Sequence, residues 1–378
     1  MIETLSLLLC VLAGRSTGLE SSGPTGIEAF VEQHARDVTY YGSGKAALRD
    51  GLASIAEPGQ NVLVPAYLPD AVVEPFCELG LEPRRYRIKE TLAPDLADVE
   101  RRIDADTVAV MSVNYFGFPQ PGLDELTALI DEHGCYHIDD NAHAPLSVVD
   151  GTLLGTRGDL GITSLRKLLP IPDGALLYCN SDGVRERFEP SSLSGVHERF
   201  DASDCQFVAK SLAVDVFSAD DRVRRSVDAL VTGRRNSLAA ANPADRYEAG
   251  KRPMSKLSAR VVDNSDPKAI RSARRENYRT WRRVLASRDD LEVRWESLPD
   301  GICPQVFPVR TRDPERFLAE LEGVGMRGAH TWPRLAESVR TDPTYETSTA
   351  LARETVVLPV QQCVDPSSIR AVGEKLRR

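Results

Sequence analysis

The feature that most constrains the fold is an alternation of two patterns between residues 44 and 180. Short apolar runs typical of buried strands alternate with longer stretches that have the apolar spacing of helices. Few hairpin turn signals separate them, so we expect the strands to be joined through helices and to lie mostly parallel in one sheet of an α/β protein. Strands are predicted at 61–67, 82–88, 107–115, 135–140, 159–164 and 174–180, and helices at 44–56, 70–80 and 122–134.

A parallel sheet brings together residues that are far apart in the sequence. Its strands point the same way, and ligands of such sheets bind beyond the carboxyl ends of the strands. Four segments that follow predicted strands are therefore expected to border one cleft: Pro65–Tyr67, Asn114–Tyr115, Asp140–His143 and Ser164–Lys167.

The chain is long enough for two domains, because 378 residues exceed what one core usually serves. A long basic amphipathic helix is predicted at 266–290. Two strands and a helix follow it, at 291–297, 303–311 and 313–325. We therefore expect a large domain over 26–265 and a smaller C-terminal α/β domain over 266–378.

An apolar run at residues 5–14 could suggest a signal peptide or a membrane anchor. Glu3 precedes it and no basic residue does, whereas the start of a signal peptide is positively charged. The run is also too short to span a bilayer. Residues 1–25 are therefore predicted to form an N-terminal helical segment, and no membrane partner is expected.

Charge and cysteine content narrow the class of protein. The formal net charge is −9, which argues against nucleic-acid binding because that function needs a basic face. The seven cysteines are scattered and odd in number, so neither a disulfide framework nor a zinc site is indicated. Free thiols suit a reducing cytoplasm, and no metal ligand is predicted.

Lys167 stands out because the chain strongly prefers arginine: only eight of its 47 basic residues are lysines. Unlike arginine, lysine can lose its proton when buried and attack a carbonyl. Ser164 and Lys167 also match the S-x-x-K motif of β-lactamases, in which a helix presents both side chains. Pro170 and Pro172 would end such a helix at once, and the companion motifs are missing, so an imine-forming amine fits Lys167 better.

Two further segments suggest binding groups, although each has a simpler interpretation. Ser43, between two glycines before the helix at 44–56, would expose backbone N–H groups that suit a phosphate, but a plain helix cap explains the turn about as well. Asp140, at the end of a strand, could meet a protonated ring nitrogen, with His143 bonding a ring oxygen. A turn-capping aspartate and a core histidine would explain this pair equally.

Taken together, these pieces match the needs of one cofactor, pyridoxal phosphate. It requires a lysine for a Schiff base, a carboxylate for the pyridinium nitrogen and a cradle for the phosphate. Lys167, Asp140 and the turn at Ser43–Gly44 supply the three, in the order cradle, carboxylate, lysine along the chain.

The sequence also resembles the DegT/StrS-type sugar aminotransferases, a family of fold-type-I pyridoxal phosphate enzymes, over roughly residues 25–378. SGKAAL resembles the family's phosphate-binding SGTAAL turn, and HIDDNAHA resembles its VIEDAAQA segment. Further matching segments lie at 61–88, 112–126, 158–177, 274–278, 332–335 and 356–362. The resemblance implies a large domain with a mostly parallel sheet and a smaller C-terminal domain.

The resemblance also implies residue roles. Lys167 would bind the cofactor and move protons, Asp140 would contact the pyridine nitrogen, and His143 would lie near the ring oxygen, where the family has glutamine. Ser164 would contact the phosphate, together with Ser43, Gly44 and Lys45 of the SGKAAL turn. An aromatic near Tyr67 would cover the ring.

Several positions depart from the family pattern and suggest a divergent branch. Lys45 stands where the family has threonine, which replaces a phosphate hydroxyl with an ammonium that can still pair with the phosphate. Pro69 occupies a position that is often aromatic, which leaves the stacking partner open. Ala175 replaces one of two glycines, and Gln361 stands where histidine is common.

The function implied by the resemblance is a pyridoxal phosphate-dependent transaminase of polysaccharide biosynthesis. It would move an amino group from an amino acid, by family likeness glutamate, to a keto-sugar linked to a nucleotide, and would act as a cytoplasmic homodimer. Lys167 argues against the family's dehydratase branch, which has histidine there. Two alternatives stay open: another pyridoxal phosphate chemistry of the lyase or desulfurase type, and a non-catalytic relative that only binds cofactor or a partner.

Overall fold

A seven-stranded sheet lies at the centre of the larger part of the computed structural model, which describes residues 26–217 and 243–377. The spatial order is β1-β9-β8-β5-β4-β2-β3, and β3, β2, β4, β5 and β8 are mutually parallel neighbours, whereas β9 runs antiparallel to both β8 and β1. The predicted α/β class with a mostly parallel sheet is confirmed. The strands are β1 (Val38–Tyr41), β2 (Asn61–Pro65), β3 (Glu82–Tyr86), β4 (Thr107–Val113), β5 (Tyr136–Asp140), β8 (Leu160–Ser164) and β9 (Ala175–Cys179).

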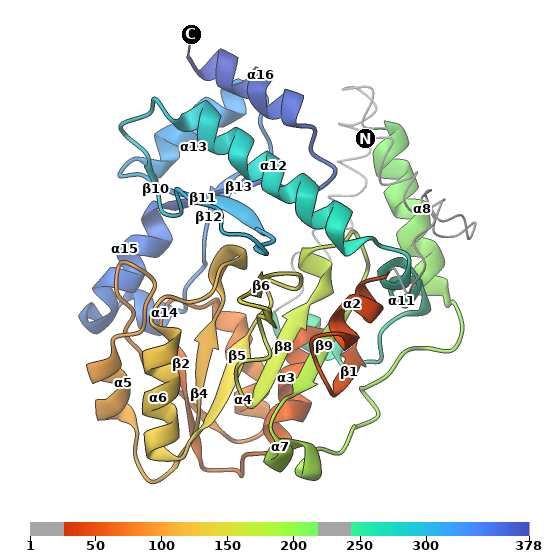
Figure 1. Cartoon of the computed structure of the whole chain (residues 1–378), viewed down its shortest axis with the longest axis vertical. Helices are drawn as coiled ribbons and strands as arrows, with labels where there is room; N and C mark the ends of the chain where they lie inside the picture. Colours follow the sequence, from red (N-terminus) through yellow and green to blue (C-terminus); the bar gives the residue numbers. More distant parts are fainter. Residues whose placement is uncertain (1–25, 218–242, 378) are drawn as a thin grey trace.

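Helices cover both faces of this sheet (Figure 1). Helices α3 (Gly44–Ala53) and α4 (Glu74–Glu78) lie on one face, and α5 (Leu96–Arg102) and α6 (Leu123–His133) lie on the other. The helix predicted at 70–80 is split into a 3₁₀ turn and α4, with Pro75 in the first turn of α4, where its missing N–H costs nothing.

A second, antiparallel sheet lies above the carboxyl edge of the first (Figure 1). Its strands follow the order β10-β11-β13-β12, and helices α12 and α16 pack together against it. The strand predicted at 291–297 is reduced to two residues, β10. The elements are α12 (Pro267–Leu285), β10 (Glu292–Val293), β11 (Val306–Arg310), α13 (Pro314–Gly323), β12 (His330–Thr331), β13 (Thr355–Pro359) and α16 (Pro366–Leu376).

The remaining elements connect or flank these two sheets. They are α2 (Ile27–Glu32), the hairpin β6 (Val148–Val149) and β7 (Thr152–Leu153), α7 (Asp182–Arg187), α8 (Ala202–Phe217), α10 (Pro243–Gly250), α11 (Lys256–Asp263), α14 (Glu337–Arg340) and α15 (Glu346–Glu354). The N-terminal helical segment predicted at 1–25 lies outside the described residues. The domain boundary between 265 and 266 stays a prediction, although the whole second sheet follows it in the sequence.

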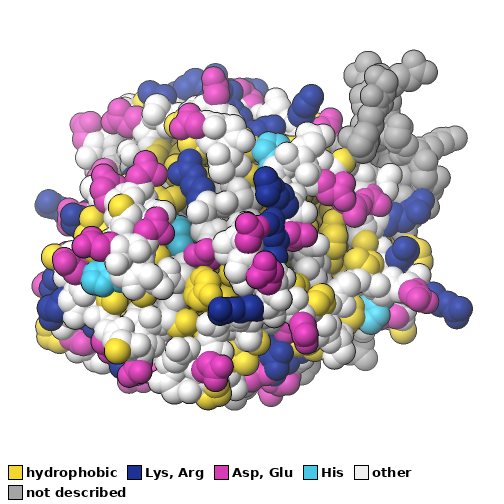
Figure 2. Space-filling view, turned by 60° about the horizontal axis from the view of Figure 1, so that its bottom comes forward, with side chains coloured by type: hydrophobic (Ala, Val, Ile, Leu, Met, Phe, Trp, Pro, Cys, Tyr) yellow, Lys and Arg dark blue, Asp and Glu magenta, His cyan; other side chains and the backbone are white. Residues whose placement is uncertain are grey.

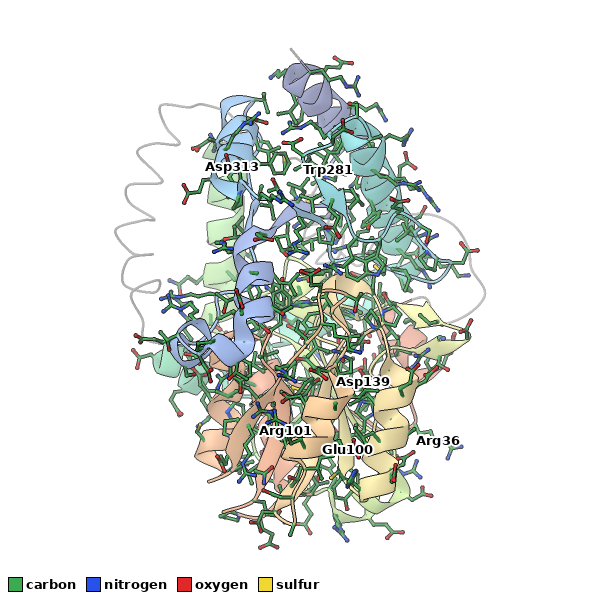
Figure 3. The ribbon with its side chains drawn as sticks, turned by 90° about the vertical axis from the view of Figure 1, so that its left-hand side faces the viewer. Arg36, Glu100, Arg101, Asp139, Trp281 and Asp313 are labelled. Atoms are coloured by element: carbon green, nitrogen blue, oxygen red, sulfur yellow. The ribbon has the colours of Figure 1, made fainter. Side chains whose placement is uncertain are left out.

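One continuous cluster of buried apolar side chains joins the two sheets. Trp281 of α12, labelled in Figure 3, is fully buried in this cluster. Its indole N–H donates to the carbonyl oxygen of Pro359 over 2.8 Å. Because this cluster is shared, burial of apolar surface holds the two sheets in one arrangement. On the face of the molecule seen in Figure 2, basic and acidic side chains are interspersed.

We expect Trp281→Ala to lower the free energy of unfolding by about 3–5 kcal/mol, because it removes a fully buried aromatic ring. Urea denaturation followed by circular dichroism measures the change. Trp295→Ala is the matched control, since Trp295 is only half-buried, stacked on Phe118 at 4.3 Å. Equal losses in the two variants would contradict the role given to burial.

Candidate active site

The carboxyl ends of β1, β2, β4, β5 and β8 meet at one edge of the sheet, because these strands share a direction. In the register of the sheet, Asp140 lies opposite Val113 on one side and Ile162 on the other. The sheet thus brings the end of β5 next to the end of β8, which leads directly to Lys167. The predicted gathering of these segments is confirmed for the backbone.

The two aspartates at the end of β5 have different surroundings. Asp139 is fully buried, and its carboxylate accepts hydrogen bonds from the Asn114 side chain (2.7 Å) and the Gly155 N–H (2.9 Å). Asp140 accepts only the Ala142 N–H, through Oδ1 at 2.9 Å, and no described donor reaches Oδ2. Asp139 is therefore a structural carboxylate, whereas Asp140 has an oxygen available for a ligand.

Lys167 ends a three-residue 3₁₀ turn, Leu165–Lys167, that follows β8. Lys167 is exposed to solvent, yet desolvation of its ammonium by the surrounding protein lowers the pKa of Lys167. The negative charge of Asp140 opposes this shift and the positive charge of Arg166 adds to it. No described residue hydrogen-bonds the Lys167 amine, so the group is free to react.

Asp140 and Lys167 influence each other in both directions. Burial raises the pKa of Asp140, and the positive charge of Lys167 acts against that rise. Each group therefore favours the ionised form of the other, although the two side chains form no direct ion pair.

His143 is buried next to the same lysine and is held in one tautomer. The Phe116 N–H donates to His143 Nδ1 over 3.2 Å. Burial, assisted by the charge of Lys167, lowers the pKa of His143 well below its usual value. The ring is therefore neutral, and because Nδ1 accepts, the proton is on Nε2. Phe116 has a left-handed backbone (φ 60°), a strained conformation that points its N–H at the histidine.

The turn before α3 borders the lysine turn. Ser43 caps α3: its Oγ accepts the Ala46 N–H (3.2 Å) and donates to the Gly250 carbonyl (3.0 Å). The N–H groups of Gly44 and Lys45 have no acceptor among the described residues, and the space beside Gly44 is open. The N-terminus of α3 thus keeps two donors for an anion.

Gly174 connects this turn to the one with Lys167. Its N–H donates to the Gly42 carbonyl (2.9 Å), and its carbonyl accepts the Leu165 N–H (3.1 Å). Gly174 has φ +124°, a conformation that needs glycine, whereas Ala175 lies in strand β9. The position that needs glycine, Gly174, still has it. Alanine at position 175, where the family has a second glycine, therefore does not disturb the turn around Gly174.

Two predicted side chains have specific surroundings. The Lys45 ammonium pairs with Glu74 and lies over the ring of Tyr247, 5.1 Å from its centroid, so its positive charge is already balanced by a carboxylate. Ser164 is half-buried at the end of β8, and its hydroxyl has no partner among the described residues.

Aromatic side chains form a wall beside His143. Tyr67 is fully buried and donates its hydroxyl to the Trp332 carbonyl over 2.8 Å. Trp332 contacts the ring of Tyr67 at 5.2 Å and that of His143 at 5.0 Å. Sequence reasoning missed the positions of Phe116 and Trp332, because the contacts of Trp332, which follows β12, with Tyr67 and His143 join segments far apart in the sequence. A backbone bridge between Pro69 and Leu335 holds the two segments together.

Comparison with known proteins agrees with this arrangement. The sequence profile of the DegT/DnrJ/EryC1/StrS aminotransferase family matches residues 26–214. The chain belongs to this family. It is 32% identical over 159 residues to a GDP-perosamine synthase of Vibrio cholerae, a match that covers 41% of this chain and 42% of the relative. It is 32% identical over 168 residues to dTDP-4-dehydro-2,3,6-trideoxy-D-glucose 4-aminotransferase of Saccharopolyspora spinosa, covering 43% of each. The match thus spans less than half of either relative.

The fold of this DegT-family chain extends beyond the matched segment. The sugar aminotransferase CalS13 from Micromonospora echinospora superposes with a TM-score of 0.68 at 20% identity, covering 100% of this chain and 97% of that protein. The fold-type-I architecture expected from the sequence is therefore confirmed over the residues that the structure describes.

The mutual influence of Asp140 and Lys167 predicts how the lysine titrates. Asp140→Asn removes a negative charge that favours the ammonium, so the pKa of Lys167 should fall and the amine should react at lower pH. Arg166→Gln removes a repelling positive charge, so the pKa of Lys167 should rise. The measurement is the rate of labelling of Lys167 by an amine-reactive reagent against pH, quantified by peptide mapping. Shifts of the same sign in both variants would refute the assignment.

Proposed function

We propose that the chain is a pyridoxal phosphate-dependent aminotransferase that moves an amino group from an amino-acid donor, glutamate, to a nucleotide-linked keto-sugar. The supporting observation is that Asp140 ends β5 and the turn with Lys167 directly follows the neighbouring parallel strand β8, where each charge acts on the other. This arrangement offers an amine and a carboxylate to opposite ends of one ligand.

The free polar groups of the site fit this cofactor. The N–H groups of Gly44 and Lys45 and the hydroxyl of Ser164 would hold the phosphate. The Ser43 hydroxyl already donates to the Gly250 carbonyl and would contribute only by turning away from it. Asp140 Oδ2, which lacks a donor among the described residues, would accept the pyridine N–H. His143 Nε2–H would donate to the ring oxygen, and its orientation is already fixed by the Phe116 N–H.

The cofactor, when bound, supplies an electron sink for the carbanion formed during transamination. The chain's residues do the rest. Lys167, whose pKa is lowered, would provide a neutral amine at Nζ and then move the proton as general acid and base. Asp140 would keep the ring nitrogen protonated. Tyr67 and the wall it forms with Trp332 would cover the ring and exclude water.

The substrate class rests on the relatives. The names of the two relatives each contain a nucleotide-linked sugar, GDP-perosamine and dTDP-4-dehydro-2,3,6-trideoxy-D-glucose, which favours a nucleotide-linked keto-sugar as acceptor. With such an acceptor, the reaction would belong to the biosynthesis of polysaccharides or of other products that contain amino sugars.

We also propose a homodimer in the cytoplasm, as the family resemblance implies. The six cysteines that the structure describes all have free thiols, which suits a reducing compartment. Over residues 26–217 and 243–377, no helix has the length and apolar character needed to cross a bilayer. Light scattering tests the assembly, and a fully active monomer would overturn this part of the proposal.

The decisive experiment combines cofactor mapping with turnover. We expect the purified protein to show a visible absorbance band with pyridoxal phosphate and to retain a pyridoxyl group on Lys167 after borohydride reduction. Lys167→Arg, which keeps the charge but cannot form an imine, should lose both signals.

Turnover separates the alternative functions. Amino transfer from glutamate or glutamine to a nucleotide-linked keto-sugar is the expected result. Release of sulfide or pyruvate would instead indicate lyase-type chemistry, and cofactor labelling of Lys167 without any turnover would indicate a non-catalytic relative.

A further inference from the structure

We propose that Arg274 of α12 is a positioning residue for Lys167, acting through the carbonyl of Leu168. This inference rests on the proposed function of Lys167 as the cofactor-binding amine. Arg274 is far from the lysine in sequence and belongs to the part of the chain that builds the second sheet.

The contacts of Arg274 converge on the residue that follows the lysine. Its side chain is 1% exposed. One terminal nitrogen, Nη2, donates to the Leu168 carbonyl over 3.0 Å. Nε donates to Gln362 Oε1 over 2.9 Å, and Gln362 Nε2 donates to the same Leu168 carbonyl over 3.0 Å. Leu168 is therefore held by two linked side chains from outside the large sheet.

The remaining nitrogen of Arg274 anchors the guanidinium to a fixed backbone. Nη1 donates to the carbonyls of Pro304 and Gln305, each at 3.2 Å. No described carboxylate pairs with Arg274. Burying the Arg274 guanidinium without a carboxylate partner is costly, and carbonyl oxygens alone accept its hydrogen bonds. We therefore interpret Arg274 as a residue that fixes the backbone segments to which it donates.

The backbone bonds of the turn with Lys167 are concentrated at its start. The Leu165 N–H donates to the Gly174 carbonyl (3.1 Å), and the N–H groups of Leu168 and Leu169 both donate to the Leu165 carbonyl (3.0 and 2.8 Å). The end of the turn is fixed by Arg274 and Gln362 at the Leu168 carbonyl. Lys167 lies between the two anchors, so loss of the second would let its side chain sample other directions.

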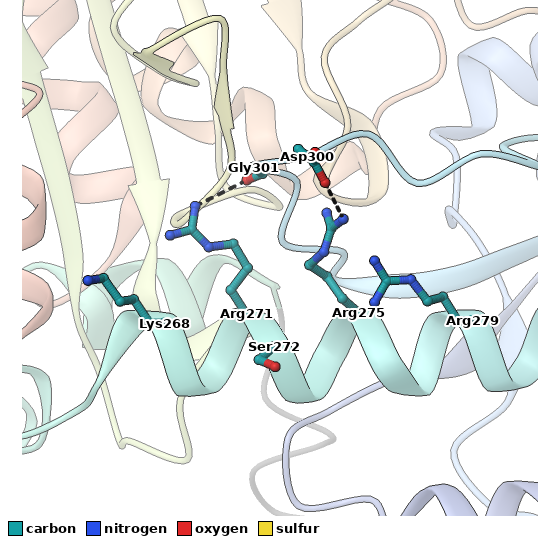
Figure 4. A pocket seen from close by; sticks show the side chains of 7 residues that line it. All are labelled: Lys268, Arg271, Ser272, Arg275, Arg279, Asp300 and Gly301. Atoms are coloured by element: carbon teal, nitrogen blue, oxygen red, sulfur yellow. Dashed lines mark hydrogen bonds and ion pairs between the residues drawn. The ribbon is translucent and has the colours of Figure 1, made fainter. Parts of the chain in front are cut away.

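The neighbouring Arg275 provides a matched control. It is also buried, and it also donates to backbone carbonyls, including that of Ile302 at 3.0 Å. Figure 4 shows it facing Asp300 beside a surface hollow of about 230 Å³ whose lining includes no residue of the lysine turn. Arg275→Lys therefore disturbs a similar bonding pattern without touching Leu168.

The test uses pyridoxal phosphate itself as the probe on the full chain. For the wild type, Arg274→Lys and Arg275→Lys, we would measure the fraction of Lys167 trapped by borohydride and the pH midpoint of the visible band. Lysine cannot reproduce the guanidinium fork. We expect trapping in Arg274→Lys to fall about 10- to 100-fold at limiting cofactor, the size of effect expected for a misplaced reacting group, with a shifted pH midpoint. Arg275→Lys should retain the wild-type values.

A second variant keeps the inference testable if Arg274→Lys fails to fold. Gln362→Glu preserves the acceptor for Arg274 and adds an ion pair, but it removes the second donor to Leu168. We expect thermal stability to be kept while trapping at Lys167 falls. Unchanged trapping in this variant, or equal losses in the Arg274 and Arg275 variants, would overturn the inference. A wild type that shows no trapping at Lys167 would instead defeat the proposed function.

Discussion

The interaction between Asp140 and Lys167 is the constraint on which the site depends. Both groups are desolvated by the protein around them, and each stabilises the charge of the other. The charge of Asp140 would be costly at its buried position without a cation nearby. The two groups come near each other because β5 and β8 are adjacent parallel strands, whose carboxyl ends lie at the same edge of the sheet.

Residues around the second sheet contact the loops that follow the strands of the first sheet. Contacts between residues around the second sheet and the strand ends of the first include Tyr67 with Trp332, Phe116 with Gln305, and Leu168 with Arg274. The Phe116 carbonyl accepts the Gln305 N–H over 2.8 Å while its own N–H orients His143. The orientation of the histidine and that of the lysine turn thus both depend on residues more than 100 positions further along the chain.

Much of the fold could be predicted because the pattern that produces it is local. Apolar runs separated by amphipathic helices specify a parallel sheet whatever the details of packing, and the predicted strands at 107–115 and 159–164 correspond to β4 and β8. Strand β1 was not predicted, since a four-residue strand pairing only with β9 has too short a pattern to be recognised. The shortening of β10 has a similar origin, because its pairing with β11 ends after two residues.

The sequence by itself determined the residue types and their order along the chain: the turn at Ser43–Gly44, then Asp140 at a strand end, then Lys167 after a strand. It could not distinguish the roles of Asp139 and Asp140 by residue type, because neighbouring residues of a strand point to opposite faces and only the packing shows which carboxylate is already bonded. The tautomer of His143, the pairing of Lys45 with Glu74 and the anchoring of Leu168 by Arg274 were likewise decided by tertiary structure. Each depends on a partner supplied by another element, and hydrogen bonds form only where folding brings donor and acceptor within about 3 Å.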